Sequence, residues 1–376
     1  MKGMKGLLGN LFGQEQKPGH AMDWNDKGIA LDALGRREEA LACFDQALAI
    51  DPQDAMAWNN KGKALAALGR RKEALACYDQ ALAIDPQQAM VWNNKGASLA
   101  ALGRREEALR CCDQALAIDP QHGMAWNNKG NALDALGRRK EALACYDQAL
   151  AINPRHGMAW NNKGLALDTL GRRKEALACY DQALAINPRH AIAWYNKGNA
   201  LDALGQRTEA VACYDEALAI DPRQAMAWDN KGNTLDALGR REEALLCYDQ
   251  ALAIDVRYAN AWLNKGNTLA ALGRREEALR CYDQALAINP QDAQAWYNKG
   301  VSLAALGRGA EAISCYDQAL ALDPQDVKAW YNKALVENAL GRKREAALSY
   351  RKFIEVAPPQ YAQQIALARQ RLAELG

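Results

Sequence analysis

Nine asparagines recur in this sequence at a constant spacing of 34 residues, and their side chains are its most regular candidates for binding chemistry. A side-chain amide both donates and accepts hydrogen bonds. A row of amides at repeat spacing can therefore hold the backbone of an extended peptide without reading its side chains. The same amides could instead bond a neighbouring loop and stabilise the stack, and the two interpretations are compatible. The nine residues are Asn60, Asn94, Asn128, Asn162, Asn196, Asn230, Asn264, Asn298 and Asn332, with Asp26 at the equivalent place near the front of the chain.

The spacing of these amides comes from a repeat that fills most of the chain. Ten tryptophans, the first Trp24 and the last Trp330, also lie 34 residues apart. Ten repeats of 34 residues occupy 340 of the 376 residues and leave 36. Because a folded catalytic domain needs at least about 50 residues, the sequence has no room for one beside the repeats. We therefore expect a protein that is not an enzyme.

Each repeat is predicted to be two antiparallel helices joined by a short turn. In residues 55–88, which we number as positions 1–34, Trp58, Gly62, Leu65 and Leu68 fall on one helical face. Gly69 can take a positive φ and end that helix. A second helical face follows from Ala74 through Leu82 and ends before Pro86. The small residues Gly62 and Ala74 allow close approach of the two helices, while Trp58 and Tyr78 fill the space around them. One such pair cannot bury its own apolar faces, so neighbouring pairs must stack.

Cysteine and histidine also recur, but their spacing argues against a chemical site. Equivalent residues of successive repeats are separated by two packed helices at about 8–10 Å per layer, whereas a disulfide needs Cα atoms within about 7 Å. Nine of the ten cysteines share one repeat position and are predicted to be small buried side chains in a reducing compartment. His122, His156 and His190 are likewise one repeat apart and cannot share a metal ion. We therefore predict no catalytic residues, no metal and no cofactor.

The repeat resembles the tetratricopeptide repeat family. The family signature of Trp, Gly, Leu, Gly, Ala, Tyr, Ala and Pro at positions 4, 8, 11, 15, 20, 24, 27 and 32 is matched almost throughout. The departures are local: Phe44 and Cys112 replace Tyr, Val256 replaces Pro, and the last repeat has Ala334 for Gly and Glu337 for Leu. The resemblance implies an all-α fold, an α-solenoid whose repeats form a right-handed superhelix. It also implies that first helices line the concave face and that positions 2, 5, 6, 9, 12 and 13 contact ligand there.

The asparagines occupy position 6, and this row is similar to the asparagine ladder in the repeat domain of the O-linked N-acetylglucosamine transferases, which holds extended proteins. Only the ladder is shared. The six concave positions carry two bases and seven acids, a net charge of −5. Four of the acids stand at position 12 of consecutive repeats. We therefore predict a groove that is acidic in its middle and prefers a neutral to basic segment; the alternative is a solvated acidic edge without a ligand. These four acids are Asp134, Asp168, Asp202 and Asp236.

Three other rows complete the pattern. Six methionines stand at position 2 beside the predicted groove, from Met22 to Met226. Methionine suits promiscuous contact surfaces, but its helical spacing favours packing as the role of this row. At position 5, asparagine gives way to Tyr195, Leu263 and other large side chains, so we expect a groove that is polar early and more apolar late. Lysine at position 7 recurs in all ten repeats and aspartate at position 25 in nine. Because an interior lysine needs a partner, we predict that its stem lies along the tryptophan and that the aspartate row serves structural pairing.

Composition limits the partner and the compartment. With 47 Lys and Arg against 45 Asp and Glu, the net charge is +2, without the basic excess of a nucleic-acid-binding protein. No stretch approaches the roughly 20 apolar residues of a membrane span, and the apolar patch in MKGMKGLLGNLFG is too short for a secretory signal. We expect a cytoplasmic protein whose partner is neither nucleic acid nor membrane.

The sequence as a whole predicts three segments and one function. Residues 1–20 are an N-terminal lead-in, 21–360 the ten repeats, and 361–376 a helix that caps the last repeat. We interpret the protein as a non-enzymatic scaffold that binds an extended protein segment in its concave groove. Two alternatives stay open: a structural protein that self-associates end to end, and an accessory subunit that presents substrates to a separate enzyme.

Overall fold

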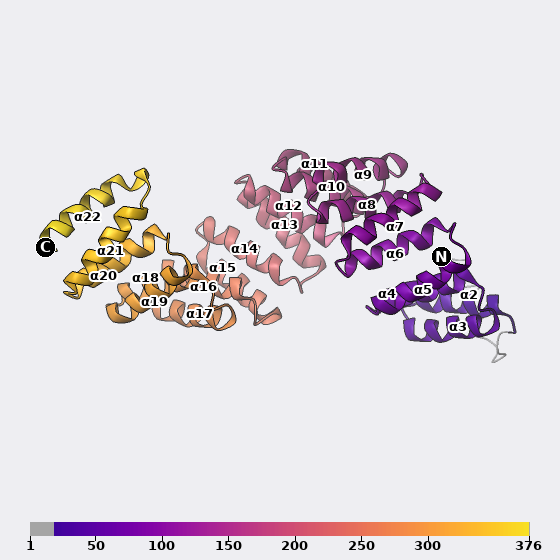
Figure 1. The fold of residues 1–376 in the computed structure, drawn as a ribbon, viewed down its shortest axis with the longest axis horizontal. Helices are drawn as coiled ribbons and strands as arrows, with labels where there is room; N and C mark the ends of the chain where they lie inside the picture. Colours follow the sequence, from indigo (N-terminus) through magenta and orange to yellow (C-terminus); the bar gives the residue numbers. More distant parts are fainter. Residues whose placement is uncertain (1–18, 376) are drawn as a thin grey trace. The chain divides into compact units, whose positions relative to one another are not determined.

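The computed structural model describes residues 19–375, and within them the chain is all-α, built from ten helix pairs and a final helix (Figure 1). The lead-in prediction falls on residues 1–18, which lie outside the described part. The first helices of the pairs are α2 (Ala21–Ala33), α4 (Ala55–Ala67), α6 (Ala89–Ala101), α8 (Gly123–Ala135), α10 (Gly157–Thr169), α12 (Ala191–Ala203), α14 (Ala225–Ala237), α16 (Ala259–Ala271), α18 (Ala293–Ala305) and α20 (Val327–Ala339). The second helices are α3 (Arg37–Ile50), α5 (Arg71–Ile84), α7 (Arg105–Ile118), α9 (Arg139–Ile152), α11 (Arg173–Ile186), α13 (Arg207–Ile220), α15 (Arg241–Ile254), α17 (Arg275–Ile288), α19 (Gly309–Leu322) and α21 (Lys343–Val356).

The helix pairs group into two compact units. Among the described residues, the N-terminal unit spans 19–188 with α2 to α11, and the C-terminal unit spans 189–375 with α12 to α22. Within each unit, a second helix packs against the first helix of its own repeat and against the first helix of the next. This arrangement is the predicted pair of antiparallel helices, stacked pair upon pair.

The turn inside each repeat forms as the sequence predicts. Gly69 has a φ of 81°, and its N–H donates to the Ala66 carbonyl at 3.0 Å. The next N–H, of Arg70, reaches back to the Leu65 carbonyl at 2.9 Å. These two bonds satisfy carbonyls that the end of the helix would otherwise leave open. All ten glycines at this position have φ between 74° and 81°, which a side chain with a Cβ rarely adopts.

The glycine at position 8 makes room for the aromatic ring at position 24 of the same repeat. A Cβ built on Gly130 would lie 2.5 Å from the nearest ring carbon of Tyr146. Tyr146 is buried against this backbone at 1% exposure. In the third repeat, where Cys112 replaces the tyrosine, a Cβ on Gly96 would lie no closer than 3.2 Å to its neighbours. The ring is thus what crowds this glycine, and the last repeat accommodates a Cβ beside a ring, with Ala334 and Tyr350 buried in one cluster.

Neighbouring repeats are joined by a three-residue cluster that we call the Trp–Lys–Asp staple, defined by positions 4 and 7 of one repeat and position 25 of the repeat before. Lys61 Nζ lies 5.3 Å from the ring centroid of Trp58 and 2.6 Å from Asp45 Oδ1 in the preceding repeat. The indole Nε1–H of Trp58 donates to the Pro52 carbonyl at 3.0 Å. The predicted stacking of lysine on tryptophan and its pairing with the aspartate row are confirmed.

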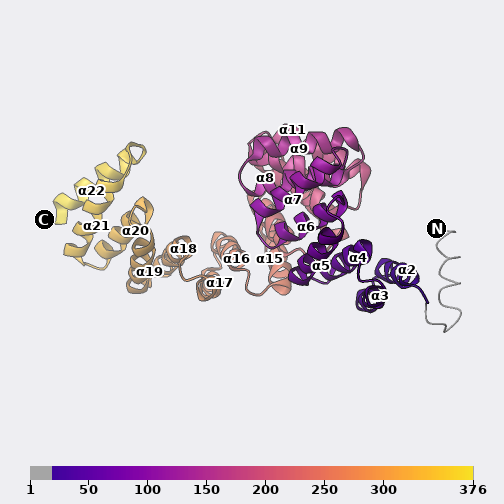
Figure 2. The same ribbon diagram turned by 45° about the vertical axis from the view of Figure 1, so that its right-hand side comes forward.

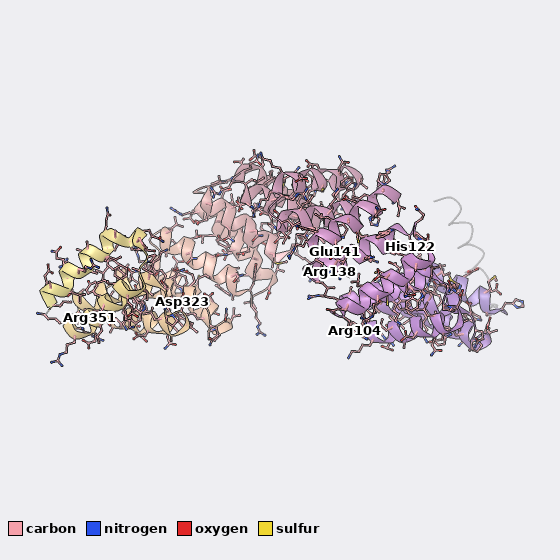
Figure 3. All side chains as sticks on the ribbon, turned by 45° about the horizontal axis from the view of Figure 1, so that its top comes forward. Arg104, His122, Arg138, Glu141, Asp323 and Arg351 are labelled. Atoms are coloured by element: carbon pink, nitrogen blue, oxygen red, sulfur yellow. The ribbon has the colours of Figure 1, made fainter. Side chains whose placement is uncertain are left out.

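The staple recurs with little variation. Lysine lies 5.2–5.7 Å from the tryptophan centroid in every repeat, and the eight lysine–aspartate pairs that the structure resolves measure 2.5–2.7 Å. Where Val256 replaces proline, Trp262 still donates to its carbonyl at 2.9 Å, so the junction keeps the same anchor. The final repeat has Arg351 at position 25, exposed at the end of the stack (Figure 3). No lysine of a further repeat follows there, so an aspartate would have no partner.

The last repeat is covered by a short 3₁₀ turn, η1 (Pro359–Tyr361), and by α22 (Ala362–Leu375), which lies against α21 (Figure 2). Ala368 is fully buried in this contact, and Ile365 and Leu372 pack against the cluster around Tyr350 and Phe353. The apolar side of the last helix pair is therefore closed by the chain itself.

We predict that Gly130→Ala and Gly96→Ala differ sharply in stability. The first change forces a Cβ into the Tyr146 ring and should lower the free energy of unfolding by about 1–3 kcal/mol. The second meets the smaller Cys112, and the roughly 1 kcal/mol gained in helix propensity should offset the tighter packing. Thermal unfolding followed by circular dichroism measures both. Equal losses in the two variants would show that ring packing does not set the need for glycine.

Candidate functional site

The candidate site is the first-helix face, which we define as positions 2, 5, 6, 9, 12 and 13 of the first helices. Within each unit, consecutive first helices contact one another directly. Consecutive second helices of the same unit make no comparable contact within residues 19–375. The first helices therefore lie on the more crowded, inner side of each stack.

The position-6 asparagines lie on this face and link adjacent first helices. In the N-terminal unit, Asn128 Nδ2 donates to Asn93 Oδ1 at 2.8 Å, and its equivalents Asn60, Asn94 and Asn162 make the same bond at 3.0–3.2 Å. The acceptor is always position 5 of the preceding repeat. The structural alternative drawn from the sequence was a bond to a neighbouring loop. These amides bond a neighbouring helix instead.

In the C-terminal unit the same donors find different acceptors. Asn230 donates to Tyr195 Oη at 3.0 Å, and Asn332 donates to Tyr297 Oη at 3.0 Å. Asn298 donates to the position-9 amide of Asn267 at 2.8 Å. The ladder therefore continues through the C-terminal unit although the residue at position 5 changes.

Burial separates the two adjacent rows of amides. The position-5 residues Asn59, Asn93 and Asn127 are at most 2% exposed, so they are sealed between repeats. The predicted position-6 residues are half-buried, except Asn196, which is 7% exposed. The ladder is therefore a surface feature whose donors face inward, while the row beside it is interior.

The hydrogen-bond direction determines what the ladder can still offer. Asn264 Nδ2 lies 3.0 Å from Asp229 Oδ1, and a carboxylate only accepts, so the ladder amide must be the donor there. Asn162 uses both amide hydrogens, toward Asn127 at 3.2 Å and Asn131 at 2.9 Å. Its Oδ1 receives only a long bond of 3.3 Å from the adjacent Asn161. A carbonyl oxygen has two lone pairs, so the group left for a ligand is chiefly an acceptor.

The acidic row at position 12 is partly neutralised. Asp134 Oδ1 lies 3.4 Å from Arg139 Nε, and the corresponding pairs of Asp168, Asp202 and Asp236 measure 3.3–3.8 Å. These side chains are 22–38% exposed. Burial raises the pKa of Asp168, and Arg173 opposes that shift. The position-17 arginines reach across the turn toward these acids. The negative electrostatic field over the first-helix face is therefore weaker than its net charge of −5 indicates.

The methionine row corrects one expectation. Met124, Met158 and Met226 are 55–60% exposed, so these side chains do not pack in the core as the spacing favoured. The large residues at position 5 do the opposite: Tyr195 lies 6.2 Å from Tyr214 between ring centroids, and Tyr331 lies 4.9 Å from Phe353. The expectation of a face that is polar early and more apolar late concerned position 5 and stays a prediction. At position 2 the order is reversed, since polar side chains appear there only from Asn260 onward.

The histidine row has a local role that sequence reasoning missed. His122 and His156 each accept, through Nδ1, the backbone N–H three residues further on at 3.2 Å. This is the bond of a helix N-cap, and Asp54 and Asp292 make it in other repeats. Burial lowers the pKa of His156. The sequence contained a signal for this capping role, because the histidines directly precede first helices at the position where other repeats have aspartate.

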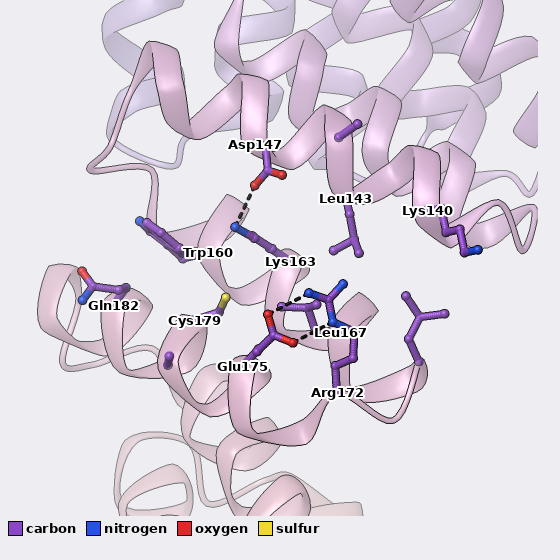
Figure 4. A pocket seen from close by; sticks show the side chains of 13 residues that line it. Lys140, Leu143, Asp147, Trp160, Lys163, Leu167, Arg172, Glu175, Cys179 and Gln182 are labelled. Atoms are coloured by element: carbon purple, nitrogen blue, oxygen red, sulfur yellow. Dashed lines mark hydrogen bonds and ion pairs between the residues drawn. The ribbon is translucent and has the colours of Figure 1, made fainter.

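A pocket of about 1100 Å³ lies on the opposite side, between α9, α10 and α11 (Figure 4). Its walls carry two ion pairs, Lys163 with Asp147 at 2.7 Å and Arg172 with Glu175 at 2.7 Å. Cys179 faces it, but burial raises the pKa of this thiol, so it is a poor nucleophile. An equivalent pocket lies between the second and third repeats. The pocket is thus a gap between two second helices and the first helix between them, and four of its charged side chains are already paired within the chain.

Neither a metal site nor a membrane span is found in the described part of the chain. Residues 19–375 hold no group of three or more histidine, cysteine, aspartate or glutamate side chains placed to bind a metal ion. No helix among these residues combines the length and apolar character needed to cross a membrane.

Comparison with known proteins gives consistent matches along the chain. Profiles described as tetratricopeptide repeat match residues 25–89, 161–225, 263–326 and 305–362, and also 87–155 and 121–189. A profile described as TPR repeat matches residues 232–273. No curated protein matches the sequence.

Solved structures with similar folds cover different shares of the chain. YrrB, described as a TPR protein with an unusual peptide-binding site, is 26% identical with a TM-score of 0.43, covering 50% of this chain and 97% of YrrB. Yeast Tom70 is 13% identical with a TM-score of 0.44, covering 94% and 96%. Cut9–Hcn1, a hetero-tetramer of the APC/C, is 17% identical with a TM-score of 0.52, covering 100% and 80%, and it shows the same fold.

We predict that Asp229→Asn stabilises the protein in a pH-dependent way. Asp229 is 3% exposed, and burial raises its pKa although Asn264 and Tyr258 donate to it. A carboxyl whose pKa is raised by folding stabilises the fold at low pH, and this contribution is lost as pH rises through the folded pKa. The variant should therefore gain about 1–2 kcal/mol at pH 7 and little near pH 4.

Urea unfolding at both pH values measures this effect, with Asn127→Asp, the reverse change at position 5 of another repeat, as control. The control should lose stability at pH 7 and less at pH 4. A gain for Asp229→Asn that is the same at both pH values would contradict the assignment to buried charge.

Proposed function

Because this chain belongs to the tetratricopeptide repeat family, we propose that it is a non-enzymatic scaffold that binds an extended segment of another protein along its first-helix face. Tetratricopeptide repeats are modules of protein–protein interaction, and the finer proposal concerns the groups that hold the partner. The peptide-binding residues proposed are the position-6 asparagines, with Asp134, Asp168, Asp202 and Asp236 as an acidic border. No cofactor or metal takes part.

The observation that supports this proposal is the half-exposed ladder, in which Asn60, Asn94, Asn128 and Asn162 each donate at least one amide hydrogen to the neighbouring first helix. An extended peptide leaves its own N–H and C=O groups without internal partners. Its N–H groups can donate to the ladder carbonyls, such as those of Asn94 and Asn128. Such contacts read the backbone and tolerate many side chains. Each is worth about 0.5–1.5 kcal/mol, so affinity depends on several repeats acting together.

Charge supports a neutral to basic segment. The position-12 aspartates stand half-exposed along the ladder, and their arginine partners sit at 3.3–3.8 Å, too long for strong hydrogen bonds. A lysine or arginine of the partner could approach the remaining oxygen of these carboxylates. The preference should be modest, because the arginines already offset part of the charge.

Self-assembly end to end is less well supported. Position 3 is a fully buried alanine or valine in every later repeat, from Ala57 to Ala329, but it is the exposed Asp23 in the first repeat. At the other end α22 covers the last helix pair. A second copy would have to bury a carboxylate at one end and displace a helix at the other.

The compartment proposed is the cytoplasm. All ten cysteines are buried, and none of them is in a disulfide. Buried cysteines without disulfides in this number fit a reducing compartment.

We predict that replacing Asn94, Asn128 and Asn162 together by alanine lowers retention of short peptides by at least about tenfold, the effect of losing about 1.4 kcal/mol. The probe is a pool of random-sequence peptides passed over the immobilised full chain, with retained peptides quantified by mass spectrometry.

The matched control replaces Asn59, Asn93 and Asn127 by alanine. It removes the same three interhelical bonds but leaves the half-exposed amides in place. The control should lose stability and keep retention. Undiminished retention in the ladder variant, or equal losses in both, would reject the ladder as the binding element.

A further inference from the structure

The N-terminal unit carries an exposed apolar row beside the ladder, which we call the methionine strip. It stands on the first turn of five consecutive first helices and is not covered by any described part of the unit. Methionine is unbranched and adaptable, and it is over-represented at surfaces that bind varied apolar partners. The strip consists of Met22 at 73% exposure, Met56 at 41%, Met90 at 40%, Met124 at 56% and Met158 at 55%.

The strip adjoins the ladder one helical turn away. Positions 2 and 6 are neighbours on the same face of a helix. The ninth repeat shows the contact directly, because Gln294 Nε2 donates to Asn298 Oδ1 at 2.8 Å. There a polar side chain at position 2 occupies the carbonyl of the ladder amide. A thioether has no hydrogen to donate, so the equivalent carbonyls of Asn128 and Asn162 receive only long bonds of 3.3–3.4 Å from the adjacent asparagine and keep a lone pair for a ligand.

The spacing of the strip selects one backbone conformation. Direct side-chain bonds of 2.8–3.2 Å join consecutive first helices, and helices packed this closely lie about 8–10 Å apart. A polyproline II segment has three residues per turn and rises about 3.1 Å per residue, so equivalent side chains recur about every 9.3 Å. A β-strand repeats a face every two residues, at about 6.8 Å, and falls out of step within two repeats.

We propose that the methionine strip binds a partner segment in the polyproline II conformation with an apolar side chain at every third residue. This inference rests on the proposed function and specifies the ligand of the same face. The apolar side chains lie between successive methionines, and backbone N–H groups of the segment donate to the ladder carbonyls. Residues that make those bonds are therefore not proline, although the conformation is the one that proline favours.

Charge complementarity defines the residues between the apolar ones. In the N-terminal unit the first-helix face carries four acids against one base, Lys63, a net charge of −3. A segment with lysine or arginine between its apolar residues fits this field better than an acidic one. The four acids are Asp26, Asp32, Asp134 and Asp168.

A helical partner is the competing geometry. Residues seven apart on a helix recur at about 10.5 Å, which also approaches the repeat spacing. A helix has already bonded its N–H groups internally, so it would leave the ladder carbonyls unpaired. The two occupants therefore differ in whether backbone N–H groups are required.

The test uses fluorescein-labelled peptides of about 15 residues, three for each of the five repeats, titrated with the full-length chain and followed by fluorescence anisotropy. One peptide places leucine at every third residue with lysine and serine between. Peptides of the same composition place leucine at every second residue or on a helical heptad. We expect the first to bind at least about tenfold more tightly than either.

Two further arms test the contacts. Proline placed at residues that donate N–H groups should abolish the preference. Changing Met90, Met124 and Met158 together to glutamine, the residue found in the ninth repeat, should lower affinity for the first peptide about tenfold. The corresponding leucine variant should keep this affinity. Both variants should fold, because these exposed positions contribute little to folding.

The outcomes separate this inference from the proposed function. The proposal for the methionine strip is wrong if the glutamine variant binds the first peptide as tightly as the parent does. It is also wrong if a peptide with another leucine spacing binds equally tightly or more tightly. The strip is rejected in the same way if none of the three peptides binds. In each case the proposed function still stands when the Asn94, Asn128 and Asn162 variant loses retention of random peptides.

Discussion

The lysine at position 7 is the interaction on which the rest of the structure depends. It lies over the tryptophan of its own repeat and pairs with an aspartate of the preceding repeat at 2.5–2.7 Å. The lysine side chains are 15–25% exposed and their aspartate partners 47–57%, so each pair is half-exposed and contributes mainly by its fixed geometry. Because one group contacts two repeats at fixed distances, it is one of the contacts that fix how far apart and at what angle successive helix pairs lie.

A constant interval between repeats is what turns single side chains into rows. Once the first helices are held at one spacing, most position-6 amides reach position 5 of the preceding repeat, Asn298 reaches position 9, and amide hydrogens are thereby used in the stack. The carbonyls are then presented at the same interval, with methionines beside them in the N-terminal unit. Under the proposed function, stability uses the amide nitrogen and binding uses the carbonyl oxygen of the same side chain, so the structural and functional interpretations of the ladder do not compete.

The repeats that depart from the common sequence show which contacts can be exchanged. Cys112 in place of tyrosine leaves its glycine in a less crowded setting, and Asp229 in place of asparagine keeps the interhelical bond but introduces a buried charge. In the last repeat Glu337 replaces a core leucine at 2% exposure, and burial raises its pKa; Lys333 lies 3.7 Å away. Cys112 and Asp229 lie within the array, whereas Asp23 and Arg351 are departures at its two ends.

The sequence by itself determined the helix pairs, their turns and the pairing of neighbours. These features follow from local rules: Gly69 must take a positive φ, Gly62 must face a large ring, and a lysine beside a core tryptophan must find an acid. The limits of the three segments given from the sequence stay predictions, as does the role of each site residue in binding.

Only the tertiary structure decided which asparagine of each adjacent pair is sealed, which way its amide points, and how far the acids are neutralised. Adjacent positions on a helix differ by about 100° in direction, so a small change in the angle between repeats exchanges the buried and the exposed residue. That angle results from contacts made by several helices at once. For the same reason the exposure of Met124, the arginine partner of Asp134 and the capping role of His156 could not be obtained from spacing within one repeat.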